Sequence, residues 1–193
     1  MRVLKNMLIA GGTGRNTGKT EYLCRLISRL SGDRKIIALK ISGIKPGNDL
    51  HHGRHSPPPE KFRLIEETCR DGVKDSSKML VAGALRAFYL RTRDEFLEEA
   101  LDHFFTIAGR DAFIIAESAR LRKIIRPGLF IMVRRQGDDV TMKSVADLIP
   151  LVDVMVNSDG STFNPPPERI GLEKGGWYLL PGFASRNFKV WRE

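Results

Sequence analysis

The chain has 193 residues, 41% hydrophobic and 28% charged, which fits one globular domain and excludes a disordered chain. No apolar run approaches the roughly 20 residues that span a bilayer, and the two cysteines have no metal or redox spacing, so we expect a cytoplasmic protein without a membrane partner. The net charge of +9 favours anionic partners such as nucleotides, but no zinc-finger or RNP-type pattern accompanies it, which argues against a nucleic-acid-binding protein.

Short apolar runs alternate with helical stretches along the chain. This alternation predicts one α/β domain over residues 1–193, with three layers, a mostly parallel sheet and helices on both faces. We expect strands at 7–10, 36–41, 85–90, 112–116, 129–133 and 154–157. Helices are expected at 21–30, at 144–148, and from Asp94, as the cap, to about 108. Residues 42–59 predict a loop, and an irregular tail is expected from about residue 158.

A glycine-rich segment, Gly-Gly-Thr-Gly-Arg-Asn-Thr-Gly-Lys-Thr at residues 11–20, follows the first predicted strand and opens a helix. This context is typical of a P-loop, whose backbone N–H groups surround phosphates while the lysine reaches the β- and γ-phosphates and the threonine binds Mg²⁺. The usual pattern has glycine where Thr13 stands. The nucleotide-binding residues predicted here are Gly12, Gly14, Arg15, Asn16, Thr17, Gly18, Lys19, Thr20 and Glu21. The alternative is a glycine-rich turn that binds nothing.

An acidic residue ends a buried strand in many Mg²⁺-nucleotide sites. Glu117 directly follows the apolar run at 113–116, and the carboxyl ends of parallel strands share one edge of the sheet. We therefore expect Glu117 beside the P-loop as an Mg²⁺ ligand. The alternative is an ordinary salt-bridged or capping glutamate.

A second segment resembles a known signature. Lys74-Asp75-Ser76, five further residues and then Ala82-Gly83-Ala84 resemble the Gly-Lys-Asp-Ser…Ala-Gly-Ala pattern of the MobB family, the molybdopterin-guanine dinucleotide biosynthesis adaptor proteins. The order of features is also similar over roughly residues 7 to 135. Lys40 stands at the family's Ile-Lys-His strand end, and Glu117 at its Glu-Gly. Thr13, Ile41 and Ser118 depart from the family pattern.

The resemblance implies a P-loop NTPase fold, binding of GTP with Mg²⁺ and slow hydrolysis. It also implies a homodimer, and delivery of nucleotide or cofactor to a partner enzyme of molybdenum cofactor biosynthesis. On this model the catalytic residues are Lys19, Asp75 and Glu117, and the metal ligands are Thr20, Asp75 and Glu117. The alternative for Asp75 is a helix N-cap without a ligand.

The base is less constrained by the sequence. Asn157 ends the predicted strand at 154–157, near the place where GTPases have the asparagine of Asn-Lys-x-Asp, so we expect it to contact a purine, with ATP as the alternative to GTP. A second interpretation of the chain is a P-loop kinase or ATP-dependent ligase-like enzyme acting on an anionic metabolite. Further residues with open alternatives are His51, His52 and His55 (a substrate-covering loop or a metal site) and Arg120, Arg122 and Arg126 (a pyrophosphate clamp or a solvated loop).

Overall fold

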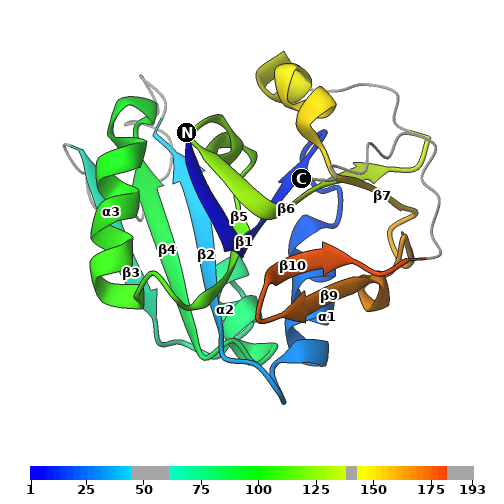
Figure 1. Cartoon of the computed structure of the whole chain (residues 1–193), viewed down its shortest axis with the longest axis horizontal. Helices are drawn as coiled ribbons and strands as arrows, with labels where there is room; N and C mark the ends of the chain where they lie inside the picture. Colours follow the sequence, from blue (N-terminus) through cyan, green and yellow to red (C-terminus); the bar gives the residue numbers. More distant parts are fainter. Residues whose placement is uncertain (45–60, 138–142, 182–193) are drawn as a thin grey trace.

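The computed structural model describes residues 1–44, 61–137 and 143–181. Its main element is an eight-stranded sheet in the order β3-β4-β2-β5-β1-β6-β7-β8 (Figure 1). The strands are β1 (Arg2–Gly12), β2 (Ile36–Gly43), β3 (Phe62–Glu67), β4 (Arg86–Thr92), β5 (Phe113–Glu117), β6 (Ile125–Arg135), β7 (Val154–Ser158) and β8 (Phe163–Asn164). Only the edge strands β3 and β8 pair antiparallel. The predicted α/β class with a mostly parallel sheet is confirmed.

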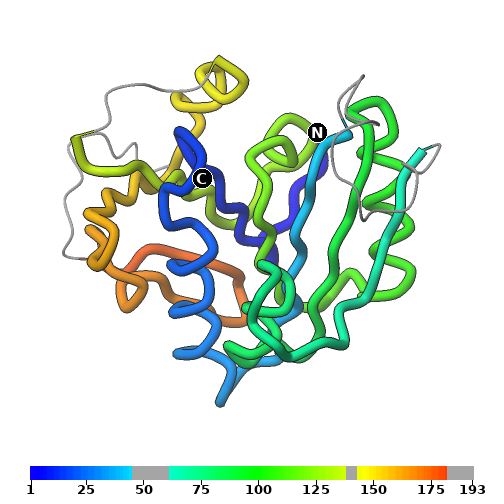
Figure 2. Tube along the Cα trace, turned by 180° about the vertical axis from the view of Figure 1, so that it is seen from behind, coloured from blue at the N-terminus to red at the C-terminus, as the bar shows by residue number. Residues whose placement is uncertain are grey.

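Helices cover both faces of this sheet, which explains why its central strands are continuous apolar runs. Helices α1 (Lys19–Leu30) and α2 (Asp75–Val81) contribute to the hydrophobic core on one face. Helix α3 (Leu97–Ala108) packs on the other face, through Leu101 and Phe104 among others. Figure 2 shows α1 running beside α2 when the molecule is seen from behind. None of the described helices combines the length and hydropathy needed to cross a membrane.

The segment after Ser158 is more regular than expected. It contains β8, the short 3₁₀ helix η5 (Pro167–Arg169) and an antiparallel hairpin of β9 (Ile170–Glu173) and β10 (Gly176–Leu179). Trp177 in the hairpin is buried and donates its indole N–H to the carbonyl of Asn6 at 2.9 Å. The prediction of an irregular tail from residue 158 was therefore wrong up to residue 179, because these strands are too short to produce a clear periodic pattern.

Three further local predictions need correction. Strand β3 was not predicted, because as an edge strand it is half exposed and its apolar residues alternate with charged ones only over a short stretch. Asp94 does not cap a helix: it begins the 3₁₀ helix η2 (Asp94–Phe96), and its carboxylate pairs with Arg120. The helix expected at 144–148 is the 3₁₀ helix η4 (Lys143–Leu151), which contains Pro150.

Candidate functional site

The predicted residues of the glycine-rich loop and the acidic strand end lie at the same edge of the sheet. Residues 11–20 (the glycine-rich loop) join β1 to α1, and β5 lies between β1 and β2. In this register Glu117 is opposite Ala10 on one side and Lys40 on the other. The chain reaches β2 on one side of β1 and later β6 on the other, so the loop occupies a switch point, where open α/β sheets bind ligands.

The conformation of the loop explains which of its residues must be glycine. Gly18 has φ 89° and Asn16 has φ 53°, the left-handed region that glycine and asparagine tolerate best. A Cβ atom on Gly12 would lie 2.6 Å from Thr17 Oγ1 and 2.9 Å from Lys19 Nζ. Thr13 does not appear among the described residues with positive φ, and it is buried. Gly12 therefore supplies the close approach, and threonine is tolerated at position 13.

The backbone of the loop is left with unused hydrogen-bond donors. Within the described residues, the N–H groups of residues 14–18 donate to no backbone carbonyl, and the first turn of any helix has free N–H groups as well. Lys19 extends over the loop, with Nζ 3.3 Å from the carbonyl oxygen of Gly14 and 3.4 Å from Thr17 Oγ1. An array of N–H donors beside an ammonium group and a helix N-terminus is suited to an anion such as phosphate.

Beside the loop lie four polar side chains from four elements, Thr20, Lys40, Asp75 and Glu117, which we call the Lys40 cluster. Thr20 donates from Oγ1 to Glu117 Oε2 at 2.9 Å. Lys40 Nζ lies 2.6 Å from Glu117 Oε1 and 2.8 Å from Asp75 Oδ2. The Glu117 side chain is only 2% exposed, whereas that of Asp75 is 36% exposed. The structure thus brings together the three residues predicted as metal ligands, with a lysine between the two carboxylates.

The charges of the cluster stabilise one another. Burial by itself lowers the pKa of Lys40, but the negative charges and hydrogen bonds of Glu117 and Asp75 outweigh it, and the net pKa lies above its usual value. Burial likewise opposes ionisation of Asp75, yet the hydrogen bond and charge of Lys40 bring the pKa of Asp75 below its usual value. Burial lowers the pKa of Lys19, an effect that Glu117 partly offsets. Lys40 and Asp75 are therefore both charged at neutral pH.

Other predicted residues lie at the rim of the site. Arg15 and Asn16 are exposed in the loop, and the exposed Glu21 forms an ion pair with Arg25 at 2.9 Å. Arg122 points into the protein, where its Nη1 donates to the carbonyl of Ile125 at 3.3 Å, so the interpretation of Arg122 as part of a pyrophosphate clamp is wrong. The histidines His51, His52 and His55 lie outside the described residues.

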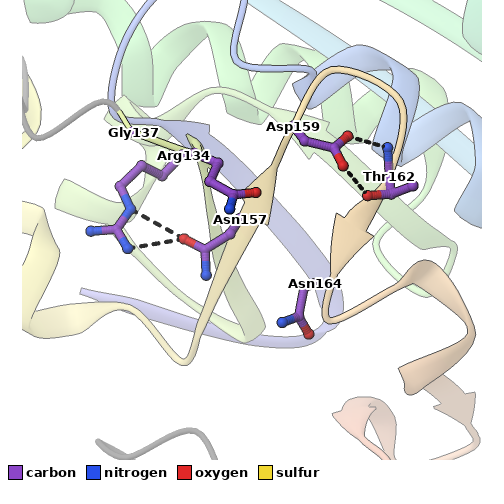
Figure 3. Close-up of a pocket in the computed structure, with 7 residues that line it drawn as sticks. Arg134, Gly137, Asn157, Asp159, Thr162 and Asn164 are labelled. Carbon is purple, nitrogen blue, oxygen red and sulfur yellow. Dashed lines mark hydrogen bonds between the residues drawn. The ribbon is translucent and has the colours of Figure 1, made fainter.

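Asn157 lies at the carboxyl end of β7 and lines a pocket of about 300 Å³, which we call the Arg134 pocket. Its Oδ1 accepts hydrogen bonds from Arg134 Nε at 3.2 Å and Nη2 at 2.9 Å (Figure 3). Asp159, Thr162 and Asn164 also line this pocket. Asn157 therefore lines a pocket at the end of β7, and its contact with a purine stays a prediction.

Comparison with known proteins adds no relative to this description. No family model matches the sequence, and no curated protein or solved structure matches the chain.

Sequence reasoning left two residues out of the predicted set of site residues. Lys40 joins the cluster because β2 pairs with β5, and Arg134 joins Asn157 because β6 pairs with β7 in the matching register. The sequence contains the same signal for both residues. Each is a basic residue at the carboxyl end of an apolar strand, and open parallel sheets bind ligands at that end.

Proposed function

We propose that this protein is a P-loop nucleotide-binding protein that binds GTP, or ATP, together with Mg²⁺, and that it acts as an adaptor or slow GTPase of the MobB type. The homodimer and the partner enzyme of cofactor biosynthesis belong to the same proposal. The observation that carries it is one juxtaposition: unpartnered loop N–H groups and Lys19 lie directly beside the hydrogen bond that joins Thr20 to Glu117.

The phosphates fit the glycine-rich loop for a simple electrostatic reason. A triphosphate carries several negative charges, and Lys19, the loop N–H groups and the N-terminus of α1 all favour anions. The lowered pKa of Lys19 reflects an ammonium group held among poorly solvated neighbours. A bound phosphate would restore the partners that burial removes from this group.

The Lys40 cluster fits Mg²⁺ in the chemistry of its donors. Mg²⁺ prefers oxygen ligands and usually combines one or two protein oxygens with phosphate oxygens and water. Thr20 and Glu117 supply a hydroxyl and a carboxylate, and Asp75 a second carboxylate. A cationic group, the Lys40 ammonium, already lies between the two carboxylates, so the electrostatic environment accepts positive charge. When bound, Mg²⁺ would neutralise charge on the phosphate oxygens.

In this proposal, slow hydrolysis requires mainly that the terminal phosphate and the attacking water are held in position. Lys19 holds the terminal phosphate and offsets the charge that develops on it. Glu117 and Asp75 are the carboxylates that orient an attacking water, and Lys40 holds both of them in place. Asp75 stays charged at neutral pH because Lys40, 2.8 Å away, holds its pKa below the usual value.

The test of nucleotide binding is calorimetry with Mg·GTP and Mg·ATP on the wild-type protein and on Lys19→Ala. Loss of one charge-assisted phosphate contact is worth about 1.5–3 kcal/mol, so we expect at least one nucleotide to bind and its affinity to fall roughly ten- to a hundredfold in the variant. Lys35→Ala is the matched control, because Lys35 is exposed immediately before β2 and outside the site. Equal affinity for wild type and Lys19→Ala would overturn the proposal.

A further inference from the structure

We propose that the sheet face beside the Lys40 cluster carries a second anion site, formed by Arg63 on β3 and Arg91 on β4, which binds the doubly charged phosphate group of a second small ligand. The anion site follows from the pairing of the strands and from the charges on them. Its role, to hold a second ligand next to the terminal phosphate of the nucleotide, rests on the proposed nucleotide binding.

Strand pairing puts both arginines on the same face of the sheet as the Lys40 cluster. Residues directly opposite each other on two paired strands share a face, and so do alternate residues along one strand. Lys40 is opposite Tyr89 on β4, and Tyr89 is opposite Ile65 on β3. The next pair on this face, two residues further along β4, is Arg91 with Arg63. The two arginines therefore form the row that follows Lys40, about 7 Å along the strand direction.

Helix α2 covers the part of this face that lies before the arginine row. It begins at Asp75, whose carboxylate pairs with Lys40, and it leads into the start of β4, so that it lies toward the end at which β2 and β4 begin (Figure 1). Arg63 is exposed and Arg91 is half-buried. Ser42, opposite Arg91 on β2, is also half-buried and adds a hydroxyl group to the row. A ligand can therefore reach this row from solvent, with the Lys40 cluster as its neighbour.

The two arginine charges lie opposite each other without a compensating acid. Like charges at directly opposite positions, with Cβ atoms about 4.5–5.5 Å apart, destabilise a sheet. Within the described residues, neither Arg63 nor Arg91 forms an ion pair or a side-chain hydrogen bond. The two acids of β3 are engaged elsewhere: Glu66 pairs with Arg86 at 2.6 Å, and Glu67 accepts a hydrogen bond from a serine of α2 at 2.7 Å. A bound anion would remove this repulsion.

The position and charge of the pair indicate the class of ligand. Charges on an exposed edge strand discourage pairing with other molecules, which explains a charge on β3 but not one on the interior strand β4. Guanidinium groups bind phosphate oxygens through two parallel N–H donors, and two of them together match a dianion such as a phosphomonoester better than a single carboxylate. Beside the pair, Tyr89 and the 42% exposed Ile65 offer an aromatic and an aliphatic surface to the body of the ligand.

The experiment measures the binding of inorganic phosphate by calorimetry in protein saturated with Mg·GTP or Mg·ATP, whichever binds more tightly, so that the glycine-rich loop is occupied. The proteins are wild type, Arg63→Met and Arg91→Met. Arg34→Met is the matched control, because Arg34 is exposed in the turn before β2. We expect phosphate to bind wild type and control equally and either variant roughly ten- to a hundredfold more weakly, the loss of one charge-assisted contact. Acetate, titrated in parallel, should bind wild type at least about tenfold more weakly than phosphate.

A second measurement needs no ligand. Arg63→Glu places an acid opposite Arg91, so its melting temperature in phosphate-free buffer should exceed that of the wild type, because a repulsive pair becomes an attractive one. A melting temperature below that of the wild type would overturn the inference. Thermal melting of the methionine variants also confirms that each is folded.

Three results of the titrations would overturn the inference: phosphate affinity unchanged in Arg91→Met, acetate binding as tightly as phosphate, or phosphate binding abolished by saturating nucleotide, since the anion would then be the nucleotide's own phosphate. If no nucleotide binds, the proposed function fails, and the role of the arginine pair in holding a second ligand fails with it. Phosphate titrated into Lys19→Ala without nucleotide then tests the anion site by itself, and a loss of binding when Arg91→Met is added would show that the site exists independently of the nucleotide.

Discussion

The two halves of the carboxyl edge of the sheet are built differently. Around β2, β5 and β1, the Lys40 cluster is mutually paired, and Glu117 at its centre is almost completely buried. Around β6 and β7, the Arg134 pocket is open, and Arg134 and Asn157 retain donors without described partners. The first half is a paired network of charges, and the second is an open pocket lined mostly by polar side chains.

Because of this difference, the two halves should respond differently to the substitution of a side chain. A buried charge network tolerates the removal of a member poorly, because the remaining charges lose their compensation. An open polar pocket tolerates substitution, since water replaces the lost partner. Changes in the Lys40 cluster should therefore lower the free energy of unfolding, whereas changes in the Arg134 pocket should leave it nearly unchanged.

The largest effect is expected for Lys40→Met. It leaves the buried Glu117 without its ion-pair partner and Asp75 with only the more distant Lys78, at 3.9 Å, and breaking a buried ion pair in this way costs about 3–5 kcal/mol. Chemical denaturation measures the free energy of unfolding, with Lys35→Met as the control for an exposed lysine. Millimolar Mg²⁺ should recover part of the loss in Lys40→Met and have little effect on the wild type. If Lys40→Met lost no more free energy of unfolding than Lys35→Met, the charges of the Lys40 cluster would not stabilise one another.

A smaller effect is expected when a methyl group is added to the loop. In Gly12→Ala the new Cβ meets Thr17 and Lys19 at less than 3 Å, which forces the lysine from its place, and overpacking of this kind costs about 1–3 kcal/mol. Because Lys19 is displaced, the nucleotide affinity measured by calorimetry should also fall. The matched change, Thr13→Gly, inserts the glycine of the usual P-loop pattern and should keep the affinity within about threefold, because Thr13 has no positive φ to relieve. The reverse order of the two variants would contradict this account of the loop.

The smallest effect concerns the pH dependence of stability through Asp75. Its pKa is below the usual value in the folded protein, so its contribution is complete above the unfolded value near 3.8 and is lost as the pH falls through the folded value. The stability gap between wild type and Asp75→Asn should therefore shrink between about pH 5 and pH 2. Because the side chain is 36% exposed, the gap should stay below about 1 kcal/mol.

The measurement is urea unfolding of both proteins across this pH range, with Asp33→Asn at an exposed turn as the control. Subtraction of the two curves removes the titration of the other carboxylates. A gap that is constant with pH would mean that Lys40 does not stabilise the charge of Asp75.

The sequence predicted the parts of the site that are contiguous in the chain. The glycine-rich loop could be recognised because its glycines, Lys19 and Thr20 lie within ten residues, and Glu117 because it ends an apolar strand. Asp75 was predicted only through a resemblance, and its contact with Lys40 depends on how α2 meets β2. The pairing of Lys40 with Glu117 depends on β5 lying between β1 and β2, a long-range arrangement that no local pattern encodes.

The elements that were not predicted also depend on long-range pairing. Strand β3 and the hairpin of β9 and β10 are short, partly exposed elements whose pairing decides their structure more than their own residues do. Arg134 looked like one basic residue among many until the register of β6 and β7 placed it against Asn157. Local motifs therefore located the glycine-rich loop and Glu117, and the sheet topology was needed to place Lys40 beside Glu117 and Arg134 beside Asn157.

The central claim is that the glycine-rich loop and the Lys40 cluster form one site for nucleotide and Mg²⁺. The most direct test is the affinity for GTP with Mg²⁺ and with EDTA, in the wild-type protein and in Glu117→Gln, which keeps the shape of the side chain and removes its charge. The account predicts that Mg²⁺ tightens binding at least about tenfold in the wild type and much less in the variant, a coupling of about 1.4 kcal/mol or more. Equal affinities with and without Mg²⁺ in the wild type, or the same gain in Glu117→Gln, would contradict it.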